Sequence, residues 1–127
     1  MTAIALMGAL AGPRLAKAEE ERKRGGGENF IQIPTLTATI LHAGGRRGVM
    51  TVETGVDVPN AQLRARATAS QPRLRAAYAG ILQTYAAGLP AGALPNAEYL
   101  SREFQRQTDL ILGRPGARLL LGTILIN

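Results

Sequence analysis

The sequence contains no cysteine and no tryptophan, and it has a single histidine, His42. Without cysteine the chain cannot form disulfides, thiol nucleophiles, thiol redox centres or cysteine-based zinc sites. This absence assigns no compartment, because an exported domain of 127 residues can fold without disulfides. Aromatic side chains are also few, namely Phe30, Tyr78, Tyr85, Tyr99 and Phe104. Most of them fall on the expected apolar faces of helices. We therefore expect no nucleic-acid partner, since such binding favours exposed aromatics among basic residues.

Groups that could carry acid–base or metal chemistry are scattered. His42 lies in a glycine-rich turn with no carboxylate near it in sequence, and the carboxylates after residue 30 are Glu53, Asp57, Glu98, Glu103 and Asp109. On one strand Glu53 and Asp57 would lie about 13 Å apart. Glycine motifs for phosphates, dinucleotides or a nucleophilic serine are missing. The sequence therefore predicts a non-enzymatic protein with no cofactor, no metal site and no evident small-molecule substrate.

Basic residues exceed acidic ones, with 15 Lys+Arg against 9 Asp+Glu and a net charge of +6. Most of the cations are arginines, which suit contacts with phosphate or carboxylate groups. The alternative is a GC-rich genome that replaces lysine by arginine throughout. The candidate interaction surface comprises two arginines in the turn and four that flank the first helical stripe: Arg46, Arg47, Arg64, Arg66, Arg73 and Arg75. For the turn pair, protection of a soluble hairpin tip against aggregation is the alternative.

The N-terminal segment, residues 1–18, is typical of an export signal. An apolar run over 2–12 precedes Pro13 and a small-residue cleavage site, Ala16-Lys17-Ala18. No basic residue precedes the run, so we expect translation to start upstream, as in a twin-arginine (Tat) signal; a simple tail is the alternative. The run is too short to span a bilayer. Residues 19–29, charged and glycine-rich, are expected to form a flexible linker, and residues 30–127 a single domain.

Hydrophobic periodicity predicts the elements of this domain. Alternating strands over 30–41 and 50–58 flank a turn at 42–48, with Pro34 marking a strand edge or a bulge. Two amphipathic helices follow, capped by Asn60 and Asn96, and Pro72 is expected to kink or restart the first. The last run, 119–126, is apolar on both faces, which predicts a strand inside the sheet. The pattern gives an α+β domain of order β-β-α-α-β, with an antiparallel-rich sheet and two helices packed on it.

The stretch from Ile33 to Asn127 resembles the periplasmic domain of the flagellar basal-body-associated protein FliL family. The similar segments are the strand entry at 31–37, the acidic strand end at 52–58, the internal helix proline at 71–75 and the terminal strand at 119–127. This resemblance implies a stomatin-like fold and a non-catalytic role supporting the stator units of the flagellar motor. The chain is also similar to small alphaproteobacterial Tat-pathway signal proteins.

We therefore expect an exported accessory or assembly protein, periplasmic or associated with the inner membrane on its periplasmic side. Its expected partners are a second copy of the chain and an inner-membrane or flagellar complex. One alternative is a soluble basic periplasmic module that binds an anionic ligand through the six arginines. Another is a Tat-exported protein with no flagellar role. Salt sensitivity separates anion binding from apolar assembly, because phosphate contacts weaken steeply with ionic strength.

Overall fold

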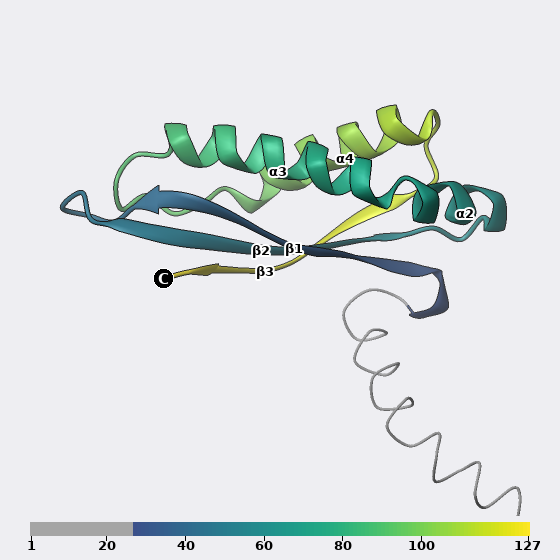
Figure 1. The fold of residues 1–127 in the computed structure, drawn as a ribbon, viewed down its shortest axis with the longest axis horizontal. Helices are drawn as coiled ribbons and strands as arrows, with labels where there is room; N and C mark the ends of the chain where they lie inside the picture. The colour runs from purple at the N-terminus through teal and green to yellow at the C-terminus, as the bar shows by residue number, and fades with distance from the viewer. Residues whose placement is uncertain (1–26) are drawn as a thin grey trace, which may run out of the picture.

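The computed structural model describes residues 27–127, which form a three-stranded antiparallel sheet with helices packed on it. The expected signal segment (1–18) and residues 19–26 of the expected linker lie outside the described residues. The elements, in chain order, are η1 (Gly27–Asn29), β1 (Phe30–Leu41), β2 (Arg47–Asp57), α2 (Ala61–Ala69), α3 (Gln71–Gly88), α4 (Ala97–Leu112) and β3 (Arg118–Ile126). The α+β class is confirmed. The three α-helices lie on the same side of the sheet (Figure 1).

Strands β1 and β2 form the predicted hairpin. Gly44 and Gly45 in its turn have φ angles of 90° and 85°, a left-handed conformation that glycine adopts without steric cost. The register shifts between Ile33 and Leu36, so Pro34 lies in a bulge, as its missing N–H requires. Beyond the bulge, alternate residues of β1 point into the core, and the threonines between them point outward.

The predicted order β-β-α-α-β is wrong in one respect, because the first helix is two helices. Helix α2 ends before Ser70, and α3 begins at Gln71 with Pro72 in its first turn. Proline has no N–H to donate and its ring clashes with the carbonyl four residues earlier, so a continuous helix cannot pass through this point. In the first turn of a new helix the N–H would be unpaired anyway.

The helix ends follow the predicted capping signals. The side chains of Asn60 and Asn96 accept hydrogen bonds from the backbone of Leu63 and Tyr99, which satisfies N–H groups at the starts of α2 and α4. Helix α4 ends at Gly113, whose φ is 83°. None of the helices within residues 27–127 is long and apolar enough to cross a membrane.

A single hydrophobic core lies between the sheet and the helices. It contains one face of β1 and β2 together with the apolar stripes of the three helices. Its largest fully buried side chains include Tyr78 and Phe104, whose ring centroids are 5.0 Å apart. Because all the helices pack on this face, the opposite face of the sheet has no covering layer among the described residues (Figure 1).

The prediction that the last strand lies inside the sheet is wrong. The strand order is β1-β2-β3, so β3 is an edge strand that pairs only with β2 within the described part of the chain. Only Leu119 in β3 is buried, while Leu125 is 55% exposed and Ile126 36% exposed. Because β1 and β2 pair directly in a hairpin, the third strand can join only at an outer position, and here it joins beside β2.

Candidate functional site

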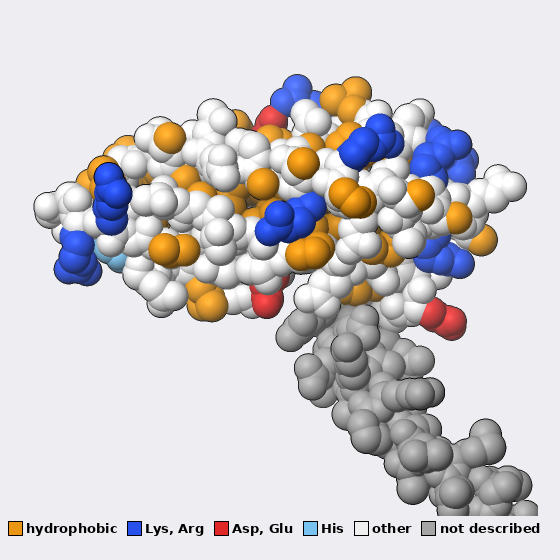
Figure 2. All heavy atoms as spheres, viewed as in Figure 1, with side chains coloured by type: hydrophobic (Ala, Val, Ile, Leu, Met, Phe, Trp, Pro, Cys, Tyr) orange, Lys and Arg blue, Asp and Glu red, His pale blue; other side chains and the backbone are white. Residues whose placement is uncertain are grey.

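The six arginines of the predicted interaction surface do not lie together. Arg46 and Arg47 are exposed at the hairpin tip, whereas the other four belong to α2 and the start of α3. Figure 2 shows basic side chains at the left end of the molecule and others spread over the middle and right of the same face. The structure therefore offers two separate groups of arginines.

Arg64 and Arg66 on α2 hold parts of the fold together. The Nη1 atom of Arg64 donates to the Asn29 side chain at 3.0 Å and to the carbonyls of Val58 and Pro59 at 2.9 and 3.1 Å. Arg66 donates to the carbonyl of Leu112 at 2.9 Å, at the C-terminal end of α4. Residues 27–29, expected as the end of the linker, are thus joined to the domain through Asn29.

The two arginines of α3 also have acceptors within the protein. Arg73 donates to the Ser70 hydroxyl at 3.2 Å, and Arg75 donates to the carbonyl of Thr35 in β1 at 3.0 Å. Four of the six candidate arginines are therefore tied to internal acceptors. This arrangement leaves Arg46 and Arg47 as the candidates best placed to meet an external anion.

The residues with acid–base chemistry are also separated. The His42 ring bonds through Nε2 to the carbonyl of Asn127 at 2.8 Å, which ties the hairpin turn to the end of β3. Glu53 and Asp57 point to the open face of the sheet, and the strand register sets Asp57 opposite Arg118. Within residues 27–127 no three histidine or carboxylate side chains gather closely enough to hold a metal ion.

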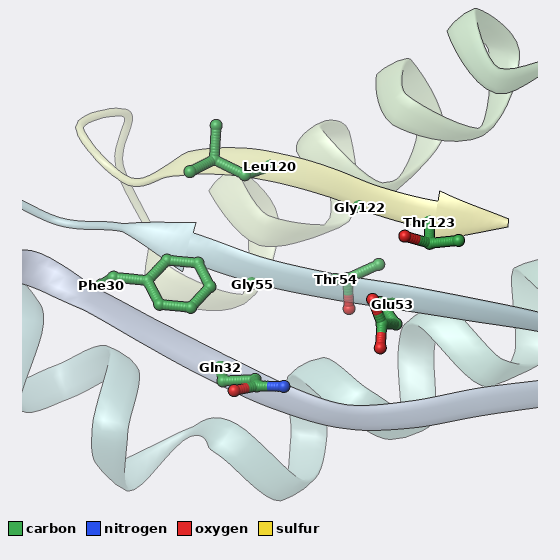
Figure 3. A pocket seen from close by; sticks show the side chains of 8 residues that line it. All are labelled: Phe30, Gln32, Glu53, Thr54, Gly55, Leu120, Gly122 and Thr123. Carbon is green, nitrogen blue, oxygen red and sulfur yellow. The ribbon is translucent and has the colours of Figure 1, made fainter. Parts of the chain in front are cut away.

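A shallow hollow of about 370 Å³ lies on the open face of the sheet, which the sequence did not predict. Phe30 and Gln32 of β1, Glu53 of β2, and Leu120 and Thr123 of β3 contribute to its lining (Figure 3). Gly55, in the centre of β2, also lines the hollow, and the Phe30 ring lies against its bare backbone. Its lining combines apolar groups with uncharged polar side chains and one carboxylate.

Other parts of the chain bond to the outer edge of β1 at three positions. Its carbonyls at Gln32 and Thr35 accept hydrogen bonds from the side chains of Gln71 and Arg75, at 2.8 and 3.0 Å. The carbonyl of Leu41 accepts from the backbone N–H of Gly92 at 2.9 Å. These contacts and the bulge interrupt the outer edge of β1 near its two ends. Between Leu36 and Ile40, no hydrogen bond among residues 27–127 covers this outer edge.

The outer edge of β3 is covered only where the strand begins. The Gln105 side chain donates to the carbonyl of Ala117 and accepts from the N–H of Leu119, both at 2.8 Å, as a neighbouring strand would. From Leu121 to Ile126 no hydrogen bond within residues 27–127 covers this edge in the same way. The sequence pattern did not indicate this free edge, because an apolar run predicts burial without showing which element provides it.

The comparisons with known proteins add no relative. A scan against protein-family models finds no family that matches the chain, and a search of curated proteins finds no match. The resemblance to the flagellar family therefore rests on the sequence pattern.

Proposed function

We propose that this protein is a non-catalytic assembly module of the cell envelope that binds its partner through the free edge of β3. The observation that carries the proposal is the contrast between the two sheet edges. The edge of β1 carries the Pro34 bulge and bonds from Gln71, Arg75 and Gly92. The outer edge of β3 from Leu121 to Ile126 has neither a bulge-forming proline nor such bonds among residues 27–127, and it is mostly aliphatic. Such an edge is a ready template for pairing with another strand.

The expected export signal supports the envelope location. It consists of the apolar run and the Ala16-Lys17-Ala18 site in the sequence. The finer form of the proposal is an accessory protein with a stomatin-like fold, of the FliL type, that supports the flagellar motor. Its support is the sequence resemblance over 33–127, together with an element order that differs from the expected one by a single helix break.

The alternative of a basic module that binds an anion has narrower support. It rests on Arg46 and Arg47, because Arg64, Arg66, Arg73 and Arg75 have internal acceptors. A pair of arginines on a glycine-rich tip can bind one phosphate or carboxylate group. Binding of this kind would weaken with salt, whereas pairing through β3 would not.

The experiment compares the native-locus protein with two variants, each tagged and fractionated from its host cells. We expect the wild-type protein in the periplasmic or membrane fraction, within an assembly larger than one chain. Leu125→Arg, at the free edge, should release it, and Leu110→Arg, on α4, should not. Leu110 is a suitable control because it is 67% exposed and lies five residues from Gln105, the α4 residue that contacts β3, which places the two about 140° apart around the helix.

A single-chain, cytoplasmic wild-type protein would overturn the proposal. The flagellar form is tested in the same strains by swimming. Reduced swimming in Leu125→Arg but not in Leu110→Arg supports it. Release from the assembly with normal swimming supports an envelope module without a flagellar role.

A further inference from the structure

The free edge of β3, its outer side from Leu121 to Ile126, is complementary to the same edge of a second copy of the chain. We infer that β3 pairs antiparallel with β3 of a second copy of this chain, about a two-fold axis between Gly122 and Thr123. This inference rests on the proposed function and names the partner of the same edge. Three features support the inference. They are the outward N–H and C=O groups of β3, the bulge in β3 and the interrupted edge of β1.

The backbone of β3 presents its hydrogen-bonding groups at matching positions. Val49 and Asn127 exchange two backbone hydrogen bonds of 3.1 and 3.0 Å, so they form a bonded pair. Bonded and non-bonded pairs alternate in an antiparallel ladder, so Ile126 and Ile124 direct their N–H and C=O groups outward. The N–H of Leu119 bonds to Gln105 on the outer side, so Leu121, two residues on, also faces outward.

The bulge brings side chains on both sides of it into line. Val52 pairs with Ile124 and Thr54 with Leu121, so β3 has one extra residue opposite Glu53. In a regular strand, residues three positions apart point to opposite faces. Here the extra residue puts Leu121 and Ile124 on the same, helix-covered face, and it puts Leu120 and Leu125 on the open face.

Self-pairing centred on the bulge therefore places apolar side chains of one copy opposite apolar side chains of the other. Leu121 and Ile124 of one copy would meet Ile124 and Leu121 of the other, with outward backbone groups facing each other. On the open face, Leu120 would meet Leu125 of the second copy. Pairing extends from Leu120 to Leu125, because Gln105 already bonds the outer N–H of the preceding residue. No charged side chain lies in this paired segment, so nothing in it repels. A two-fold contact of this kind uses the same surface on both copies.

The edge of β1 disfavours the addition of further copies. Pairing through β3 would give one continuous sheet with a β1 strand at each end. Each β1 edge carries the Pro34 bulge, and its carbonyls at Gln32, Thr35 and Leu41 are already bonded. The inferred assembly is thus a closed dimer, which distinguishes it from the open-ended stacking of an unprotected sheet.

The first test is the mass of the purified full chain in solution, measured by light scattering after gel filtration at roughly 100 µM, where an interface of micromolar Kd is saturated. We expect twice the 13.4 kDa mass of one chain. Leu125→Arg should raise the dissociation constant by about 100-fold or more, since it places a charge against apolar groups. Leu110→Arg should leave the dimer intact. A monomeric wild-type chain, or an open-ended series of oligomers, would overturn the inference.

The second test fixes the register. The chain has no cysteine, so a double variant Leu120→Cys, Leu125→Cys introduces the only thiols. In the inferred dimer these positions form a non-bonded pair with Cα atoms about 4.5 Å apart, within the range for a disulfide. Oxidation should give a covalent dimer of the double variant and of neither single variant. Equal cross-linking of the single variants, or none in any variant, would overturn this register.

The two proposals can fail separately. If the purified chain is monomeric but Leu125→Arg still releases the native-locus protein from its assembly, the edge binds a different protein. The dimer is then overturned and the proposed function stands. If the purified chain dimerises but is cytoplasmic in its host, the proposed function fails and the dimer stands.

Discussion

The ring of Phe30 in β1 lies directly over the bare backbone of Gly55 in β2. A Cβ atom built on Gly55 would collide with the Cε1 and Cζ atoms of that ring, and it would lie 2.9 Å from the carbonyl oxygen of Ile31. The strand register pairs Gly55 with Gln32, so Phe30 reaches it diagonally across the open face. An aromatic side chain placed over a strand glycine covers backbone that would otherwise be exposed. This contact shapes one wall of the hollow in Figure 3.

The change Gly55→Ala should therefore destabilise the protein. The new methyl group has to displace the ring of Phe30, and overpacking of this kind costs about 1–3 kcal/mol. Urea unfolding followed by circular dichroism measures the loss. The control is Gly80→Ala in α3, where a Cβ meets no atom within 4 Å; it should stabilise by about 0.5–1 kcal/mol, the helix preference of alanine over glycine. Equal stability of Gly55→Ala and the wild type would show that Phe30 does not need this glycine.

Thr54→Val should stabilise the protein. Thr54 is 3% exposed, and its hydroxyl has no hydrogen-bond partner within the described residues. Valine has the same shape without the unpaired polar atom, so the free energy of unfolding should rise by about 1–2 kcal/mol. Thr108→Val is the matched control. The hydroxyl of Thr108 is buried, donates to the Phe104 carbonyl at 2.7 Å and also bonds to Tyr78. Its loss should therefore lower stability, and a stabilising Thr108→Val would contradict this assignment.

Much of the fold could be predicted from local pattern. Alternation in 30–41 and 50–58, the glycines of the turn and the two asparagine caps are signals that act over a few residues, and the structure follows each of them. Pro72 was the ambiguous signal. A proline interrupts a helix and also begins one well, so the sequence left open whether it marks a kink or a restart.

The sequence was misleading where tertiary arrangement decides. The run 119–126 reads as a buried strand because apolar residues occur on both faces, but the hairpin geometry places it at the edge. From the sequence, the six candidate arginines are interpreted as one solvated surface. Arg64 and Arg66 instead bond to groups distant in sequence, Asn29 and Leu112, and no local pattern contains those partners.

Arg64→Met should destabilise the protein more than Arg47→Met does. Methionine keeps part of the aliphatic length of Arg64 but removes its hydrogen bonds to Asn29, Val58 and Pro59. Hydrogen bonds from charged groups contribute about 1.5–3 kcal/mol in total at a site of this kind. Arg47 is exposed at the end of the hairpin, so its replacement should stay within about 0.5 kcal/mol. Urea unfolding compares the two, and equal effects would show that the contacts of Arg64 contribute nothing to stability.

Stability should fall in alkaline solution because of Tyr78. Its side chain is fully buried, and this burial raises its pKa from an ordinary value near 10 to about 12. The hydrogen bond with Thr108 opposes the rise, and the charge of Asp109 adds to it. The folded protein thus holds the Tyr78 proton more tightly than the unfolded chain does. The resulting stabilisation is complete below pH 10 and is lost as the pH rises to 12.

The variant Tyr78→Phe should remove this pH dependence. In the wild type the free energy of unfolding should drop by up to about 1.4 kcal/mol per pH unit across that interval, because the unfolded chain loses the proton first. Tyr78→Phe should be less stable near neutral pH, by about 1 kcal/mol for the lost hydrogen bond to Thr108. Tyr99→Phe, at a position 38% exposed, should keep the wild-type slope. Urea unfolding of the three proteins from about pH 9 to about pH 12 measures all three curves. A slope that persists in Tyr78→Phe would assign the alkaline loss to another group.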